Sequence, residues 1–235
     1  MSLRQKSSIV SDNVPQVYAA GQKSGREAER DEFWDAFQQG GERTTYTSAF
    51  ANGWSDESLK PKYDITPSYC AQMFQRTGIV NLKQILEEQG VTLDTSRCTS
   101  LLQVFQESKC KYIPTIDARN ATNISYAFSS RAAVVEIEKL MVSENTVFTN
   151  TFVSAYDLEK LIIEGTIATN GFNIQWSTLL SHESLMSIIN ALQDCSEDTS
   201  GTAHTITLGE TNKAKLTEEE LNIAINKGWG WSKWQ

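Results

Sequence analysis

Residues 123–142, NISYAFSSRAAVVEIEKLMV, and residues 147–165, VFTNTFVSAYDLEKLIIEG, decide the fold expected for this chain. In each stretch an aromatic residue is followed by a short apolar segment. The segment LEKLIIEG alternates, so we expect Leu161 and Ile163 to point inward and Lys160 and Ile162 to point outward. The two stretches therefore predict a short, half-buried strand after each aromatic residue.

The pattern extends in both directions along the chain. The aromatic residues are separated by steps of 23, 24 and 24 residues: Phe105, Phe128, Phe152 and Trp176. An apolar or aromatic residue lies four positions before each of them, which fits one helical turn over a core: Leu101, Ile124, Phe148 and Phe172. Phe74 has the same downstream offsets, although 31 residues separate it from Phe105. A period of about 23 residues is typical of leucine-rich repeats, whose stacked units share one core.

These observations predict an α/β repeat fold, a short leucine-rich-repeat solenoid with a parallel sheet, an N-terminal helix and a C-terminal helix–strand cap. The expected divisions are an N-terminal helical segment, an extended linker, and a repeat domain whose cap begins at about residue 181: 1–41, 42–67 and 68–235. In the cap, Ser181 is expected to begin one helix, and Thr217 with Glu220 forms the capping box of another. Gly228 is expected to end that second helix.

The N-terminal helix is expected to need a partner. Its central section, REAERDE, is charged on all sides, so the helix can bury little surface except at its ends. We expect it to form a homo-oligomer through small and aromatic residues: Val14, Val17, Gly21, Phe33, Trp34 and Phe37. A helix folded back over its own first repeat is the alternative.

Composition and charge narrow the class of protein. Hydrophobic residues make up 40% of the 235 residues and charged residues 21%, which is close to the globular average and argues against disorder. The formal net charge of −8 opposes binding to nucleic acid. Because the longest apolar runs are only a few residues long, no membrane insertion is expected. The first residues, MSLRQKSSIVSDNV, lack the apolar core of a Sec signal peptide.

The sequence contains no motif for catalysis, metal binding or cofactor binding. Ser181, His182 and Glu183 are adjacent on one helical turn and point in different directions, so they cannot form a proton relay. No phosphate-binding glycine loop and no nucleophile elbow occurs. The cysteines lack the spacing of a metal or redox motif and are expected to be buried or half-buried free thiols: Cys70, Cys98, Cys110 and Cys195. We expect no catalytic residue, no metal and no cofactor, and hold an enzyme as a distant third hypothesis.

Several phrases of the sequence resemble a known family. The repeats resemble the BspA-like (Treponema surface-antigen) branch of leucine-rich repeats. Residues 25–65, 163–192 and 205–229 are similar to phrases of leucine-rich-repeat proteins encoded in phages and prophages of gut Firmicutes. The resemblance spans about residues 14–233, and the chain departs from a clean array in its long step from Phe74 to Phe105. It implies a non-enzymatic interaction protein located in a phage virion or outside the cell.

We therefore predict a binding or adhesion protein of a phage tail or baseplate, which recognises a protein or a cell-surface glycan through the solenoid face. The binding residues predicted by strand alternation are Tyr112, Glu136, Glu138, Lys160, Ile162 and Glu164. Trp229 and Trp231 are expected on one face of a last strand, either as a contact patch or as part of the core. A purely structural virion component and a bacterial surface adhesin are the alternatives.

Overall fold

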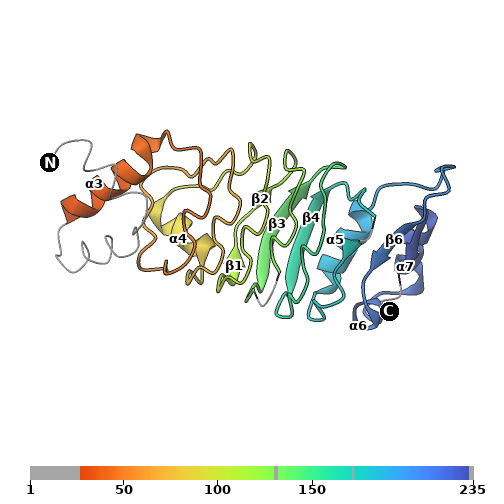
Figure 1. Ribbon diagram of the computed structural model, residues 1–235. Coiled ribbons are helices and arrows are strands. Elements are labelled where there is room, and N and C mark those ends of the chain that lie inside the picture. Colours follow the sequence, from red (N-terminus) through yellow and green to blue (C-terminus); the bar gives the residue numbers. More distant parts are fainter. Residues whose placement is uncertain (1–26, 130–131, 171, 233–235) are drawn as a thin grey trace.

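The computed structural model describes residues 27–129, 132–170 and 172–232, and its elements follow one another along one axis from α3 to α7 (Figure 1). The helical elements are α3 (Glu27–Phe37), the 3-10 turn η1 (Gln39–Gly41), α4 (Leu82–Gln89), α5 (His182–Ala191), α6 (Glu210–Lys213) and α7 (Glu218–Asn226). The strands are β1 (Tyr112–Ile113), β2 (Ile116–Asp117), β3 (Glu136–Val142), β4 (Lys160–Gly165), β5 (Phe172–Asn173), β6 (His204–Thr207) and β7 (Trp229–Trp231).

The first sheet is parallel and has β3 at its centre. β1 and β2 both pair with one edge of β3, and β4 pairs with the other edge. The register places Tyr112, Glu136 and Lys160 in one row across the three strands. Between Ile137 and Leu140, β3 has one residue more than the matching part of β4, which is a β-bulge. The predicted alternation of LEKLIIEG is confirmed. Leu161 and Ile163 are buried, whereas Lys160 and Ile162 are half-buried and Glu164 is exposed.

Helix α5 ends this sheet by occupying the free edge of β4. Ser184 Oγ accepts a hydrogen bond from the backbone N–H of Leu161 at 3.0 Å, and Ser187 Oγ accepts one from Ile163 at 3.2 Å. Ser187 Oγ also donates to the carbonyl oxygen of Leu161 at 3.1 Å. Residues three apart share one face of a helix, so the two hydroxyls meet successive donors of the strand. The helix thereby satisfies backbone groups that another strand would otherwise pair.

The second sheet is also parallel and has the order β5-β6-β7. Helix α7 precedes β7 in the chain and has Thr217 as its N-cap. The side chains of Thr217 and Glu220 form the expected capping box. The predicted N-cap of α5 is confirmed as well, because Ser181 Oγ accepts from the backbone of Ser184. Gly228 follows α7 with a φ of 84°, and a Cβ there would lie 2.8 Å from the carbonyl oxygen of Cys195. Glycine is therefore required at this position.

A ladder of phenylalanine rings runs through the core: Phe50, Phe74, Phe105, Phe128 and Phe152. Neighbouring rings are stacked, with centroid separations of 5.3, 4.9, 5.8 and 5.6 Å. Each ring is at most 1% exposed. Phe128 and Phe152, which are 24 residues apart, are thus buried at equivalent positions of the ladder. Each ring stacks against the ring of the next segment along the chain, so successive segments stabilise each other.

The residue two positions before each ring of the ladder has a left-handed backbone, with φ between 51° and 59°: Ser48, Gln72, Gln103, Tyr126 and Asn150. This conformation costs a non-glycine residue about 1–2 kcal/mol. Backbone hydrogen bonds between neighbouring segments offset the cost, as from the N–H of Phe74 to the carbonyl of Val104 at 2.8 Å. Side chains of these residues also pair, with Gln72 donating to Gln103 at 2.8 Å.

The expected leucine-rich-repeat solenoid is wrong as a description of this fold. The described residues form a mixed α/β structure with two small parallel sheets and five α-helices, and no solenoid is recognised among them. A solenoid would have one continuous parallel sheet. Here the sheet is divided in two, because α5 lies along the edge of β4 and β5 pairs with β6 instead. Nearer the N-terminus, parallel pairing is reduced to isolated bridges such as Thr45 with Tyr69 and Ile65 with Leu93.

Residues 42–67 also differ from the extended linker that the sequence predicts. Tyr46, Phe50, Trp54, Leu59 and Ile65 are all buried in the same core as the phenylalanine ladder. These apolar residues are separated by Thr, Ser and Lys, so the local sequence does not indicate that they are buried together. This segment therefore belongs to the packed domain.

Across the described residues, no helix combines the length and the apolar character needed to cross a membrane.

Candidate functional site

The outward side chains of the first sheet form the surface that the sequence predicts as a binding face. We define the sheet face as the outward residues of β1, β3 and β4 with two cations from neighbouring segments: Tyr112, Glu136, Glu138, Lys139, Lys160, Ile162 and Glu164, with Lys83 and Arg119. The alternate strand positions Ile137, Leu140, Leu161 and Ile163 are buried below it. The packed core therefore holds the backbone under the sheet face.

One end of the sheet face is a row of paired charges beside Tyr112. Tyr112 is 38% exposed. Lys160 Nζ lies 3.1 Å from Glu136 Oε1 on the neighbouring strand. Lys83 reaches over from α4, with its Nζ 2.9 Å from Glu138 Oε1 and 4.0 Å from Glu136 Oε1. The hydrogen bond from Lys83 lowers the pKa of Glu138, and the same bond raises the pKa of Lys83.

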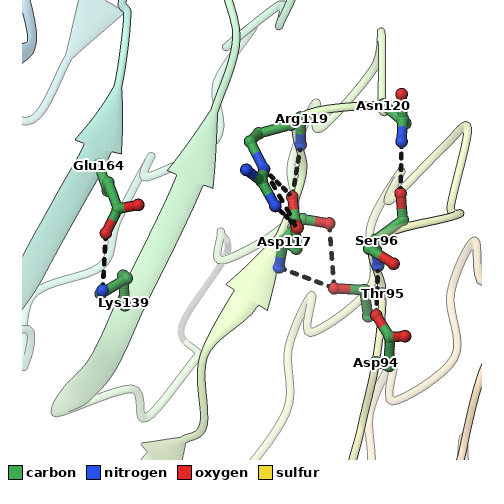
Figure 2. A network of polar contacts seen from close by, with 8 residues as sticks. All are labelled: Asp94, Thr95, Ser96, Asp117, Arg119, Asn120, Lys139 and Glu164. Carbon is green, nitrogen blue, oxygen red and sulfur yellow. Dashed lines mark hydrogen bonds and ion pairs between the residues drawn. The ribbon is translucent and has the colours of Figure 1, made fainter.

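The other end of the sheet face lies where β2, β3 and β4 finish (Figure 2). Lys139 Nζ contacts Glu164 Oε2 at 2.6 Å, and Arg119 Nη2 contacts Asp117 Oδ2 at 2.6 Å. Hydrogen bonding by Arg119 lowers the pKa of Asp117. Thr95 fixes the backbone beneath this pair, because its Oγ1 accepts from the N–H of Asp117 at 2.8 Å and donates to its carbonyl at 3.0 Å.

A second contact in the same view ties the loops beside the sheet face together. Asn120 Nδ2 donates to the carbonyl oxygen of Ser96 at 2.6 Å, and the N–H of Ser96 donates to Asp94 Oδ1 at 2.9 Å (Figure 2). The loop that carries Arg119 is thus held against the preceding segment. Arg119 itself remains accessible, with 55% of its side chain exposed.

The sheet face is a charged surface that carries both carboxylates and cations. Each carboxylate of the sheet face has a cation within 4.0 Å. The lowered pKa values of Glu138 and of Asp117, which pairs with Arg119 beside this face, favour the ionised forms of both groups. Both signs of charge alternate over short distances. Such a pattern discriminates between partners by register, because a like charge placed opposite costs binding free energy.

The predicted tryptophan patch does not lie on one exposed face. Trp229 is 1% exposed, and its indole N–H donates to the carbonyl oxygen of Gln193 at 2.7 Å. Trp229 is therefore a core residue, which corrects its assignment as a binding residue. Trp231 is partly buried against the core, and Lys213 Nζ lies 5.4 Å from its ring centroid.

The aromatic residues predicted for oligomerisation pack within their own chain. Trp34 and Phe37 are 2% and 1% exposed, and their rings contact Phe50 and Trp54 at centroid separations between 5.6 and 6.5 Å. Phe33 packs beside them. The core covers these rings, so the alternative of a helix folded back over its own domain describes α3. The other predicted contact residues lie outside the described residues: Val14, Val17 and Gly21.

Gln38 fastens the end of α3 to the domain. The residue is fully buried, its Nε2 donates to the carbonyl of Tyr63 at 2.8 Å, and its Oε1 accepts from the backbone of Lys62 at 2.8 Å and of Tyr63 at 3.1 Å. Asp35 adds contacts to Lys62 at 2.8 Å and to the Tyr63 hydroxyl at 2.5 Å. These polar contacts explain why a helix with a charged centre docks on its own chain.

An open cavity of about 470 Å³ lies beside α3, lined by Asp31, Trp34, Lys60, Pro61, Lys62 and Gln89. None of the strand residues predicted to bind a partner lines it. Within the described residues there is no group of three or more His, Cys, Asp or Glu side chains that could hold a metal ion. The sheet face is therefore the stronger candidate site.

Sequence reasoning missed the long-range partners of the sheet face. Lys83 is separated from Glu138 by 55 residues, and no local pattern marks either of them as the other's partner. Likewise, the neighbours of His182 in the sequence do not indicate its partner, because its Nε2 lies 2.9 Å from Glu220 Oε1 on α7. Arg119 carries one local signal, because it follows Asp117 by two residues at the end of a strand.

Comparison of the chain with protein-family models, with curated proteins and with solved structures finds no match in any of the three. The resemblance to phage-encoded BspA-like proteins therefore stays a prediction.

Proposed function

We propose that the protein is a non-enzymatic binding protein that recognises a protein partner through the sheet face. The observation that carries the proposal is the array of ion pairs on this face, which stands over a closely packed core. Three lysine Nζ atoms lie close to carboxylate oxygens. The distance is 2.9 Å from Lys83 to Glu138, 2.6 Å from Lys139 to Glu164 and 3.1 Å from Lys160 to Glu136. Side chains held in place lose less conformational entropy when a partner binds.

A protein partner suits this face better than a glycan does. Charged side chains of both signs offer complementary contacts to the charged side chains of another protein. Tyr112 and Ile162 add an aromatic and an aliphatic contact between these charges, and tyrosine is enriched at protein interfaces. The net charge of −8 for the chain gives no electrostatic attraction to nucleic acid.

The setting that we propose is a phage tail or baseplate, where the partner is a protein on the bacterial surface. This part of the proposal rests on the resemblance of residues 25–65, 163–192 and 205–229 to phage-encoded proteins. A purely structural role in the virion is the alternative, and it predicts no binding to cells.

The proposal is tested by binding of fluorescently labelled protein to a panel of gut Firmicutes cells, measured by flow cytometry. The variant Tyr112→Ala with Ile162→Ser should reduce the bound fluorescence at least tenfold. The matched control is Leu179→Ser with Ile225→Ala, two residues that are 53% and 45% exposed and lie off the sheet face. The control should bind as the unaltered protein does.

Treatment of the cells identifies the partner class. Trypsin should abolish binding if the partner is a protein, whereas periodate oxidation of sugars should leave it unchanged. The reverse result overturns the protein partner in favour of a glycan. Equal binding by the sheet-face variant and the control overturns the assignment of the site. Absence of binding to every strain overturns host recognition and favours the structural role.

A further inference from the structure

Cys70 and Cys98 meet in the core although 28 residues separate them in the chain. Their Sγ atoms lie 2.6 Å apart, and both residues are fully buried. A covalent S–S bond is about 2.05 Å long, so the two sulfur atoms need only a small further approach to bond. The other cysteines have no such contact with a second cysteine in the described residues.

The backbone around the two cysteines is already aligned. The N–H of Thr99 donates to the carbonyl of Ser68 at 3.3 Å on one side, and the N–H of Gln72 donates to the carbonyl of Leu102 at 2.9 Å on the other. These bonds hold the two segments side by side. Two cysteines can be bridged without strain only when the backbone already brings them together, and this arrangement does so.

We propose that Cys70 and Cys98 form a disulfide when the protein folds in the presence of a small disulfide oxidant. One cysteine thiolate attacks the oxidant and forms a mixed disulfide with release of one small thiol. The second cysteine then displaces the remaining small thiol and completes the Cys70–Cys98 bond. The protein loses two electrons and two protons, and the oxidant is reduced to two thiols.

The cross-link has a definite place in the fold. The loop that it closes contains α4, whose residues Leu82, Ile85 and Leu86 are buried and whose Lys83 reaches the sheet face. A disulfide restrains the unfolded chain more strongly as the closed loop becomes longer. By restricting the unfolded chain, the bond should raise the free energy of unfolding of the domain. The inference does not depend on the proposed binding function.

The bond should form during folding rather than afterwards. The hydrogen bond with Cys98 and burial both raise the pKa of Cys70, so the reactive thiolate is scarce once the core has closed. The test therefore refolds the reduced full chain from denaturant in a mixture of oxidised and reduced glutathione. Remaining thiols are then blocked with N-ethylmaleimide in denaturant, and the intact mass is measured.

The expected product carries two maleimide groups and has lost two hydrogen atoms. Trypsin digestion without reductant should give residues 63–76 joined to residues 98–109. The melting temperature of the oxidised protein should exceed that of the reduced protein by several degrees. Cys110→Ser and Cys195→Ser should still form the bond, whereas Cys70→Ser and Cys98→Ser should not. If the unaltered protein refolds in the oxidant and takes up four maleimide groups, or joins other cysteines, the proposal is overturned.

Discussion

The hydroxyl of Ser187 on α5 accepts the backbone N–H of Ile163 on β4 at 3.2 Å and donates to the carbonyl of Leu161 at 3.1 Å. Two backbone groups of the strand edge are thus satisfied by one side chain of a helix. Ser184 serves the N–H of Leu161 in the same way. The first sheet therefore ends at β4, because helix α5 satisfies the backbone groups at its edge.

Loss of these hydroxyls should destabilise the protein. Ser184→Ala removes a fully buried hydroxyl and leaves the N–H of Leu161 without its acceptor, which should cost about 1–3 kcal/mol of unfolding free energy. Urea denaturation followed by circular dichroism measures the change. Ser196→Ala is the control, because Ser196 is exposed and bonds only within its own loop. Equal stability of the two variants would contradict this role of α5.

Removal of one ring from the phenylalanine ladder should be costly. Phe128→Ala or Phe152→Ala creates a cavity in the core and should cost about 3–5 kcal/mol. Tyr156→Ala is the matched aromatic control, since that residue is 52% exposed, and it should cost far less. Chemical denaturation of the three variants gives the comparison. A loss below 1 kcal/mol for both phenylalanines would sink the view that the ladder organises the core.

Glycine at a left-handed position should be tolerated or favourable. Ser48 has a φ of 51° and is exposed, so Ser48→Gly relieves a conformational cost of about 1 kcal/mol that non-glycine residues pay there. Thr47→Gly next to it gains no such relief and should destabilise by about 0.5–1 kcal/mol. Thermal melts of both variants measure the difference. The same loss of stability in both would show that the backbone at Ser48 is not strained.

The ion pair between Lys83 and Glu138 should make stability depend on pH. Because the folded state lowers the pKa of Glu138 below 4.5, the pair stabilises the fold above that pH and the contribution fades as the pH falls through the folded value. Glu138→Gln should therefore lower the melting temperature at pH 7 and have less effect at pH 3. Added salt should shrink the difference at pH 7. A difference that grows at acid pH would have the wrong sign.

The docking of α3 should contribute measurably to stability. Trp34→Ala removes a ring that is 2% exposed and contacts Phe37, Phe50 and Trp54, and it should cost about 3–5 kcal/mol. Denaturation of the full-length chain measures the loss. Glu42→Ala, an exposed change nearby, provides the control and should stay within about 0.5 kcal/mol of the unaltered protein. A Trp34→Ala variant as stable as this control would mean that α3 is not held by its aromatic end.

Parts of the sheet face could be predicted because strand alternation is a local property. Alternation places Glu136, Lys160 and Ile162 outward between buried residues, and the burial pattern agrees. Lys83 could not be found in this way. It acts from a helix that precedes β3 by many residues, and its reach to Glu138 depends on how α4 lies beside the sheet.

The local features of this protein follow from short sequence patterns. The caps at Ser181 and Thr217, the turn at Gly228 and the spacing of the buried phenylalanines all depend on contacts within a few residues or on a simple period. Long-range packing settles three features: α5 closes the edge of β4, residues 42–67 join the core, and α3 docks on its own domain. Those outcomes depend on which distant segments satisfy each other's backbone groups and cover each other's apolar surface, and no local pattern encodes that choice.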